Sequence, residues 1–129
     1  MPHLHLDYSA NLDAAIDMGA VCEALRAEAS RIEAFPMPGI RVRATRVDHY
    51  AIADGDPKHG FIDLKVRLRA GRPEAVKRDA IERLFEALKE AVAPALATRS
   101  IALSAELRDI DADLAPKAGT IRDHLEAGA

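Results

Sequence analysis

The sequence is poor in cysteine and in aromatic residues, and these absences exclude several classes of site. Its one cysteine, Cys22, cannot form an internal disulfide or a cysteine cage for a metal ion. Aromatic residues make up only 4% of the chain, and no basic stripe with interleaved aromatics occurs, so a nucleic-acid partner is not expected. The net charge of −3 comes from acidic and basic residues that are interspersed along the chain. An anionic ligand would therefore need a local cluster of cations.

Long apolar runs are absent as well. No stretch approaches the length of a membrane-spanning helix, and the first residues lack the basic start and apolar core of a signal peptide. We therefore expect a soluble, cytoplasmic protein with no membrane partner. With 129 residues, 49% of them hydrophobic, the chain is long enough for one domain with a real core and too short for two. The sequence thus predicts a single domain over residues 1–129.

The amino-terminal stretch is typical of a half-buried strand that starts on a proline. Apolar Leu4, Leu6 and Tyr8 alternate with polar residues, which is the two-residue period of such a strand. Proline is tolerated at the first position because its missing N–H has no ladder partner there. If Met1 is removed, Pro2 becomes a free secondary amine on a rigid element. If Met1 stays, the same nitrogen is an amide without basicity.

The first half of the chain predicts a helix and a second strand. Asn11 and Asp17 are two candidate helix starts, and apolar residues recur at helical spacing after the second. They form one face of a helix: Met18, Val21, Cys22, Leu25, Ala29 and Ile32. A Phe-Pro-Met-Pro-Gly segment then ends the helix. In the strand predicted over residues 39–47, Arg41 and Arg43 face away from the apolar side chains.

The second half repeats this order. Residues 61–69 alternate so strongly that they form the clearest strand of the sequence. A helix follows with Pro73 at its first position, and Pro94 kinks or ends it. A fourth strand is predicted over residues 99–108. In the tail, residues 120–123 have the sequence of a capping box for a last helical turn.

This order of elements predicts an α+β fold built from two βαβ halves. The halves cover about residues 1–58 and 59–110, and a tail covers residues 111–129. Right-handed crossovers place both helices on one face of a four-stranded mixed sheet. The opposite face is left uncovered, and a bare sheet with open edges more readily meets another subunit than water. We therefore expect a closed homo-oligomer.

Two arginines stand at element boundaries, where binding sites are usually built. Arg41 starts the second strand, and Arg72 precedes the second helix. Guanidinium groups bind carboxylates through parallel N–H donors, and a helix amino terminus adds positive potential, so the pair suits an anionic substrate. Two solvated surface arginines are the alternative interpretation.

His3, His5 and Asp7 share one strand face, but no further cluster supplies the remaining ligands, so no metal site is expected.

Four short motifs at these boundaries are informative together. They are Met-Pro-His at residues 1–3, Gly-Ile-Arg-Val-Arg-Ala at residues 39–44, Ala-Asp-Gly at residues 53–55 and Ala-Gly-Arg at residues 70–72. In this order they resemble the 5-carboxymethyl-2-hydroxymuconate delta-isomerase family of the tautomerase superfamily, which uses an amino-terminal proline. The resemblance extends to about Leu125. It implies a tautomerase-like homotrimer of βαβ-repeat subunits that needs no cofactor.

The resemblance also implies roles for single residues. Carried over position by position, Pro2 matches the catalytic base, exposed after removal of Met1. Arg41 and Arg72 match arginines of the family's active site, which are expected to bind the substrate and to assist catalysis. Burial and these two cations would lower the pKa of the amine below its usual value of about 8. A neutral amine could then act as both base and acid.

The implied activity is that of an isomerase, a keto-enol tautomerase in the catabolism of aromatic compounds. It would move a double bond in a carboxylated dienol such as 5-carboxymethyl-2-hydroxymuconate. Two alternatives stay open, because a proline and two arginines serve all three functions. One is a non-catalytic oligomeric module that binds an acidic metabolite. The other is a proline-dependent enzyme that acts on another unsaturated acid.

Overall fold

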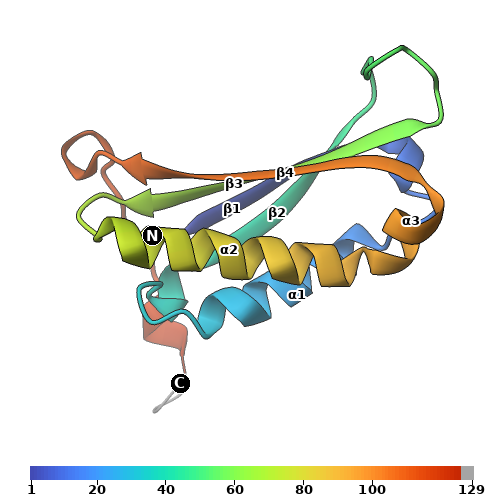
Figure 1. The fold of residues 1–129 in the computed structure, drawn as a ribbon. Helices are drawn as coiled ribbons and strands as arrows, with labels where there is room; N and C mark the ends of the chain where they lie inside the picture. The colour runs from blue at the N-terminus through green and yellow to red at the C-terminus, as the bar shows by residue number, and fades with distance from the viewer. Residues whose placement is uncertain (126–129) are drawn as a thin grey trace.

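The computed structural model describes residues 1–125 and contains a four-stranded sheet with helices on one face (Figure 1). Strands β1 (His3–Ser9), β2 (Arg41–Val47), β3 (His59–Arg69) and β4 (Ser100–Ile110) lie in the spatial order β2-β1-β3-β4. The pairs β1–β2 and β3–β4 are parallel, whereas β1 and β3 in the centre are antiparallel. The predicted strand-helix-strand order occurs twice, and the mixed sheet is confirmed.

Two long helices cover one face of the sheet (Figure 1). They are α1 (Met18–Ser30) and α2 (Glu74–Ala91), and the short α3 (Ala93–Thr98) leads into β4. Helix α1 begins after the second candidate start, because the side chain of Asp17 accepts a hydrogen bond from the backbone N–H of Ala20 at 3.1 Å. Four 3₁₀ turns complete the chain: η1 (Ala10–Leu12), η2 (Met37–Gly39), η3 (Ala112–Leu114) and η4 (Ile121–His124).

Two predictions about helix ends are wrong, and in both cases the backbone angles give the reason. Pro73 lies at the N-cap of α2 instead of the first helical position, because its ψ of 151° is extended. Thr120 precedes η4, but its side chain makes no capping hydrogen bond. An N-cap residue normally has an extended backbone, whereas Thr120 has a ψ of 5°. The prediction that Pro94 ends or kinks α2 is confirmed, since the helix ends at Ala91.

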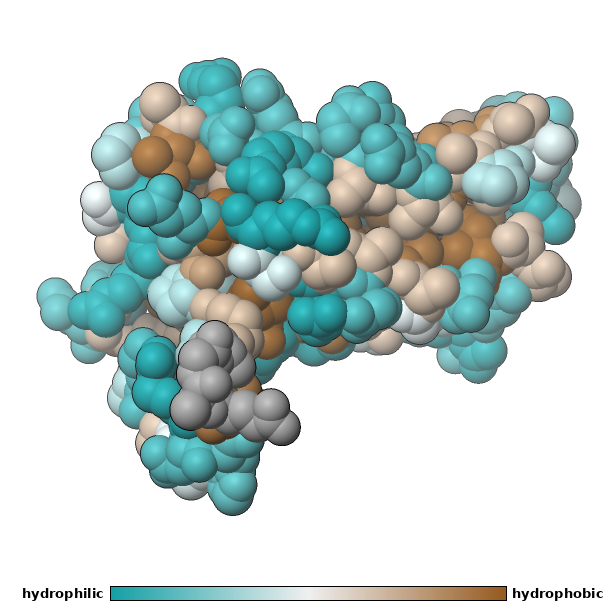
Figure 2. Space-filling model, turned by 90° about the horizontal axis from the view of Figure 1, so that it is seen from below, coloured by the Kyte–Doolittle hydropathy of each residue, from teal (hydrophilic) through white to brown (hydrophobic). Residues whose placement is uncertain are grey.

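The hydrophobic core lies between the sheet and the two long helices. The central strands and the inner faces of the helices contribute its fully buried side chains, among them Leu4, Leu6, Ile62, Leu64, Leu25, Leu84 and Leu88. Each such side chain contributes about 1.5–3 kcal/mol on burial. Seen from the helix side, the surface mixes hydrophilic and apolar side chains (Figure 2). Cys22 is half-buried against this core, and burial raises the pKa of its thiol, which makes it a poor nucleophile.

A buried serine links β1 to β3. Ser9 is fully buried, and its Oγ accepts a hydrogen bond from the backbone N–H of Phe61 at 2.9 Å and donates one to Oδ1 of Asn11 at 2.7 Å. Gly60 packs against this group, and a Cβ atom on it would lie only 2.8 Å from Cδ2 of Leu12. Residue 60 therefore has no room for a side chain beside the buried Leu12 and Ser9.

The face of the sheet opposite the helices is polar. Lys65 lies there with its Nζ 3.9 Å from Asp7 and 3.8 Å from Asp63, and Ser104 donates a hydrogen bond to Asp63 at 2.8 Å. No helix in residues 1–125 covers this face (Figure 1). Lys65 is paired with acidic neighbours, whereas Arg43 and Arg67 on the same face form no ion pair with a carboxylate of residues 1–125. The face is therefore hydrophilic and rich in cations. Across the same described residues, no helix is long and apolar enough to cross a membrane.

Candidate active site

The amino terminus lies at one end of the sheet, where it meets the turn before β2 and the carboxyl-terminal segment (Figure 1). Pro2 is buried and directly precedes β1. Its carbonyl oxygen accepts a hydrogen bond from the backbone N–H of Arg41 at 3.1 Å. The strand register continues with His3 opposite Arg41. Strand pairing therefore holds the predicted base and one of the predicted arginines at neighbouring positions.

Gly39 allows the turn before β2 to approach the amino terminus closely. A Cβ atom on this residue would lie 3.3 Å from Cα of Met1 and 3.3 Å from Cδ of Pro2. Such contacts are tighter than ordinary van der Waals separations, so a side chain here would have to displace the Met1–Pro2 unit. This close approach explains why glycine suits the first position of the Gly-Ile-Arg motif, and the sequence alone does not reveal it.

A cavity of about 330 Å³ opens beside Met1. This volume falls at the lower end of the range for small-molecule sites, which is roughly 300–1,000 Å³. Its lining contains the cationic residues Arg41, Lys117 and Arg122, and the other described residues that line it are apolar or small. The cavity therefore has the size and the charge to hold a small anion.

The positive surroundings act on the amino group itself. Burial lowers the pKa of the Met1 amine below its ordinary value of 8.0, and the charges of Lys117, Arg72, Arg41 and Arg69 lower it further, in that order. Both causes disfavour the ammonium form. An amine at this end of the chain is therefore shifted toward its neutral, basic form near neutral pH.

Arg41 lines the cavity with an exposed side chain. Its Nη1 donates one long hydrogen bond of 3.4 Å to the carbonyl oxygen of Gly39. Most of its guanidinium donors are therefore available to a carboxylate in the cavity. The location agrees with a substrate-binding role, which remains a prediction.

Arg72 lies differently from what its position before a helix suggested. Its Nη2 donates to the carbonyl oxygen of Ala34 at 2.9 Å, and its Nη1 donates to that of Arg69 at 3.0 Å. The guanidinium thereby ties the segment after α1 to the turn after β3, and Arg72 is not among the residues that line the cavity. Its charge still acts on the amino group. Arg72 thus contributes structural and electrostatic effects, and direct substrate binding by it stays a prediction.

Two further cations come from the carboxyl-terminal tail. Lys117 and Arg122 line the cavity together with Arg41, although neither belongs to a motif that pointed to a site. The tail has no hydrophobic period that would fix its course, so the sequence did not indicate that it returns to the amino terminus. The one available signal was the presence of two basic residues in an otherwise irregular segment.

The histidines of β1 form contacts with neighbouring side chains. Nδ1 of His3 lies 3.3 Å from Nη1 of Arg43, and Nε2 of His5 lies 2.9 Å from Oγ1 of Thr45 and 3.4 Å from Asp7. Burial and nearby arginines lower the pKa of His3. Across the part of the chain that the structure describes, no group of three or more potential ligands is arranged to hold a metal ion.

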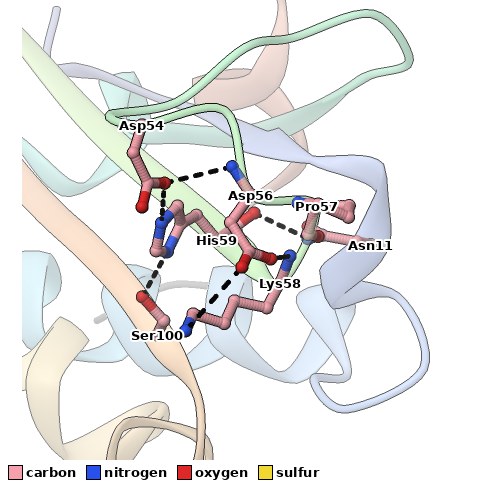
Figure 3. A network of polar contacts seen from close by, with 7 residues as sticks. All are labelled: Asn11, Asp54, Asp56, Pro57, Lys58, His59 and Ser100. Carbon is pink, nitrogen blue, oxygen red and sulfur yellow. Dashed lines mark hydrogen bonds and ion pairs between the residues drawn. The ribbon is translucent and has the colours of Figure 1, made fainter.

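A second polar cluster lies at the start of β3 and β4 (Figure 3). Nε2 of His59 lies 2.7 Å from Oδ1 of Asp54, and Nδ1 of the same ring lies 2.7 Å from Oγ of Ser100. The backbone N–H of Asp56 and the ring of His59 hold the pKa of Asp54 below its usual value. This row of three side chains fastens the loop before β3 to the first residue of β4. Sequence reasoning missed this row, because its members are 5 and 41 residues apart.

Comparisons with known proteins agree on one family. A family model described as 5-carboxymethyl-2-hydroxymuconate isomerase matches residues 2–125. The chain is 29% identical over 110 residues to the 5-carboxymethyl-2-hydroxymuconate Delta-isomerase of Escherichia coli, which covers 85% of this chain and 87% of that protein.

Solved structures extend the likeness to the whole fold. A crystal structure of a 5-carboxymethyl-2-hydroxymuconate delta-isomerase is similar with a TM-score of 0.92 and 35% identity, over 100% of this chain and 95% of the other. The structure of a 5-carboxymethyl-2-hydroxymuconate isomerase from Deinococcus radiodurans R1 has a TM-score of 0.87 and 34% identity, over 95% of this chain and 92% of the other.

Proposed function

We propose that this chain, which belongs to the 5-carboxymethyl-2-hydroxymuconate isomerase family and is an isomerase, moves a double bond in a carboxylated dienol. In this proposal Met1 is removed and the secondary amine of Pro2 is the general acid and base. The observation that carries it is the amino terminus beside a cation-lined cavity of about 330 Å³. 5-Carboxymethyl-2-hydroxymuconate, which the names of the relatives contain, is the proposed type of substrate.

The reaction needs one group that first accepts and then returns a proton. The neutral amine removes the proton from the enol hydroxyl, and the electrons shift through the conjugated system toward a distant carbon. The resulting ammonium then delivers the same proton to that carbon, which leaves a ketone and a displaced double bond. Substrate and product have the same atoms and the same oxidation state, so no cofactor is required.

The surroundings of the amine support both steps. Burial and the charges of Lys117, Arg72 and Arg41 favour the neutral form of the amine that has to start the reaction. Pro2 adjoins Met1 and is in contact range of the same glycine, so its amine would experience the same surroundings. Arg41 would hold a carboxylate of the substrate and stabilise the negative charge that develops on the enol oxygen.

We also propose that the protein acts as a homotrimer. The polar face of the sheet is uncovered in the single chain, and both edge strands, β2 and β4, have unpaired backbone groups along one side. Association of identical subunits through this face and these edges would satisfy them. The number three follows the family resemblance of the sequence motifs.

The proposal is tested by following the ultraviolet absorbance of 5-carboxymethyl-2-hydroxymuconate or of 2-hydroxymuconate in the presence of protein. An intact mass must first show that Met1 is absent. Rapid decay above the buffer rate supports the proposal. Protein with a free Pro2 that binds the dienol without accelerating its decay would instead be a binding module. Activity only toward a different unsaturated acid would mean that the protein is a proline-dependent enzyme with another substrate.

A further inference from the structure

The carboxyl-terminal tail returns to the amino terminus after β4. From Ile110 it passes through η3 and reaches η4, and Lys117 lies between these two turns. Lys117 lines the cavity of about 330 Å³ beside Met1, and it also lines a second hollow of about 210 Å³ that includes Met1 and Arg69. Lys117 and Met1 therefore border both spaces, with Arg41 and Arg122 lining the first and Arg69 lining the second.

Lys117 differs from the other lysines of the chain. Lys58, Lys65, Lys77 and Lys89 each have their Nζ within 4.0 Å of a carboxylate. Within residues 1–125, Lys117 has no such neighbour, and it lies instead among further cations around an open space. Among the charges that lower the pKa of the amino group, that of Lys117 has the largest effect. A cluster of like charges around a cavity costs stability unless an anion joins it.

We propose that Lys117 binds the carboxymethyl carboxylate that 5-carboxymethyl-2-hydroxymuconate has and 2-hydroxymuconate lacks, so that the tail selects dienols with an additional carboxylate group. This inference rests on the proposed function. Arg41, on β2, would hold the carboxylate next to the enol. A dienol with three carboxylates then gains a contact with Lys117 that a dienol with two carboxylates lacks. Lys117 is in this view a specificity residue, and proton transfer does not require it.

The test compares two substrates in two variants. 5-Carboxymethyl-2-hydroxymuconate has three carboxylates, and 2-hydroxymuconate has two. Lys117→Met is expected to lower kcat/KM for the first by about tenfold or more, mainly through KM, and to lower it for the second by less than about threefold. Lys89→Met removes the same charge from the outer side of α2, where Lys89 pairs with Glu86, and should change neither value.

The pH of the assay must be chosen so that a change in substrate binding is distinguished from a change in the pKa of the base. Loss of Lys117 raises the pKa of the amine, which slows both substrates alike at low pH, so the ratio of the two kcat/KM values is measured where the amine is fully neutral. Thermal unfolding confirms that both variants are folded. An unchanged ratio in Lys117→Met, with folding intact, would overturn the inference while leaving the isomerase assignment in place.

A binding measurement keeps the two proposals distinguishable. Calorimetry with propane-1,2,3-tricarboxylate and with glutarate needs no turnover. Wild-type protein should prefer the tricarboxylate by about tenfold or more, and Lys117→Met should lose this preference. If neither dienol is isomerised by protein with a free Pro2, the proposed function fails, and the calorimetric preference still decides whether Lys117 binds the extra carboxylate. Equal affinities for the two acids in wild-type protein would overturn the inference.

Discussion

The backbone N–H of Arg41 donates a hydrogen bond of 3.1 Å to the carbonyl oxygen of Pro2, immediately before the first pair of the β1–β2 ladder. Two residues that are far apart in the sequence are thus set side by side by main-chain geometry. Their side chains need no contact with each other to be correctly placed. Main-chain pairing can therefore keep the proposed base and the proposed carboxylate-binding arginine in register while the guanidinium stays available to a ligand.

Pro2→Ala should lose most of the isomerase activity, by roughly 100-fold or more in kcat, because general acid–base catalysis typically contributes 10²–10⁴-fold. The variant keeps a primary amine at a less constrained position, so its nitrogen is both mobile and differently solvated. Activity is measured by the ultraviolet decay of the dienol after intact mass has shown that Met1 is removed. Pro57→Ala, in the exposed loop before β3, serves as the control. Full activity of Pro2→Ala would show that another group is the base.

The pH dependence should reflect the lowered pKa of the amine. The reactive form is neutral, so kcat/KM rises with pH through this pKa, and the midpoint of the rise is expected below the pKa of an amino-terminal proline without such surroundings. Lys117→Met removes the cation with the largest effect, which raises the pKa and moves the midpoint to higher pH. Lys89→Met leaves it where it was. A midpoint that stays in place, or moves to lower pH, in Lys117→Met contradicts this electrostatic account.

Arg41→Ala and Arg72→Ala should differ in their effects on stability. Arg41→Ala removes an exposed side chain with one long hydrogen bond, so it should lower kcat/KM with little change in unfolding free energy. Arg72→Ala leaves the carbonyl oxygens of Ala34 and Arg69 without their donor and should cost about 1–3 kcal/mol of stability besides weakening substrate binding and turnover.

Urea unfolding and steady-state kinetics on the same samples separate these outcomes. The control is Arg78→Ala, since Arg78 is exposed on α2 and, within residues 1–125, pairs only with Glu74 at 3.5 Å. Surface pairs of this kind contribute at most about 1 kcal/mol. Equal unfolding free energies for Arg72→Ala and wild-type protein would argue against the structural role of its two hydrogen bonds.

Gly60→Ala should destabilise the fold by about 1–3 kcal/mol through overpacking. The new methyl group would lie 2.8 Å from Cδ2 of Leu12 and 3.1 Å from Oγ of Ser9, and both residues are buried. Gly119→Ala, where an added Cβ meets no atom of the described residues within 4 Å, should leave the unfolding free energy within about 0.5 kcal/mol of wild type. Chemical denaturation monitored by circular dichroism compares the two. Similar stability for both would mean that the core at Leu12 can rearrange freely.

The homotrimer should appear in light scattering as a particle of about 42 kDa, three times the 14.0 kDa of one chain. The mass should not change over a wide range of protein concentrations if the subunits bury the uncovered sheet face. A mass of about 14 kDa at micromolar concentration would show that the polar face is exposed to water in solution.

The sequence predicted those features that depend on local periodicity. Alternation along β3 placed Leu64 and Val66 in the core, and helical spacing after Asp17 placed α1 and its inner face correctly. Arg41 was found because it belongs to a strand whose start is marked by a turn. Such signals lie within a few residues of one another, and sequence reasoning captures them well.

What escaped prediction depends on contacts between distant and irregular segments. The position of Lys117 is set by how the tail folds back after β4, and no periodic pattern encodes that path. Arg72 marks a boundary in the sequence, but its hydrogen bond to Ala34 depends on the packing of the two halves. The capping box at Thr120 failed for a related reason, because the backbone angles there follow the course of the tail and not the local motif.

The antiparallel pairing of β1 with β3 relates the two halves of the chain by an approximate twofold axis. His3 opposite Arg41 then corresponds to His59 opposite Ser100, and the place of Pro2 corresponds to Lys58. In the second half that nitrogen is a peptide N–H, bound to Oδ1 of Asp56 at 2.9 Å, and the row of Asp54, His59 and Ser100 seals the position (Figure 3). The second half therefore offers no equivalent of the amine that we propose for Pro2, because the nitrogen of Lys58 is part of a peptide bond.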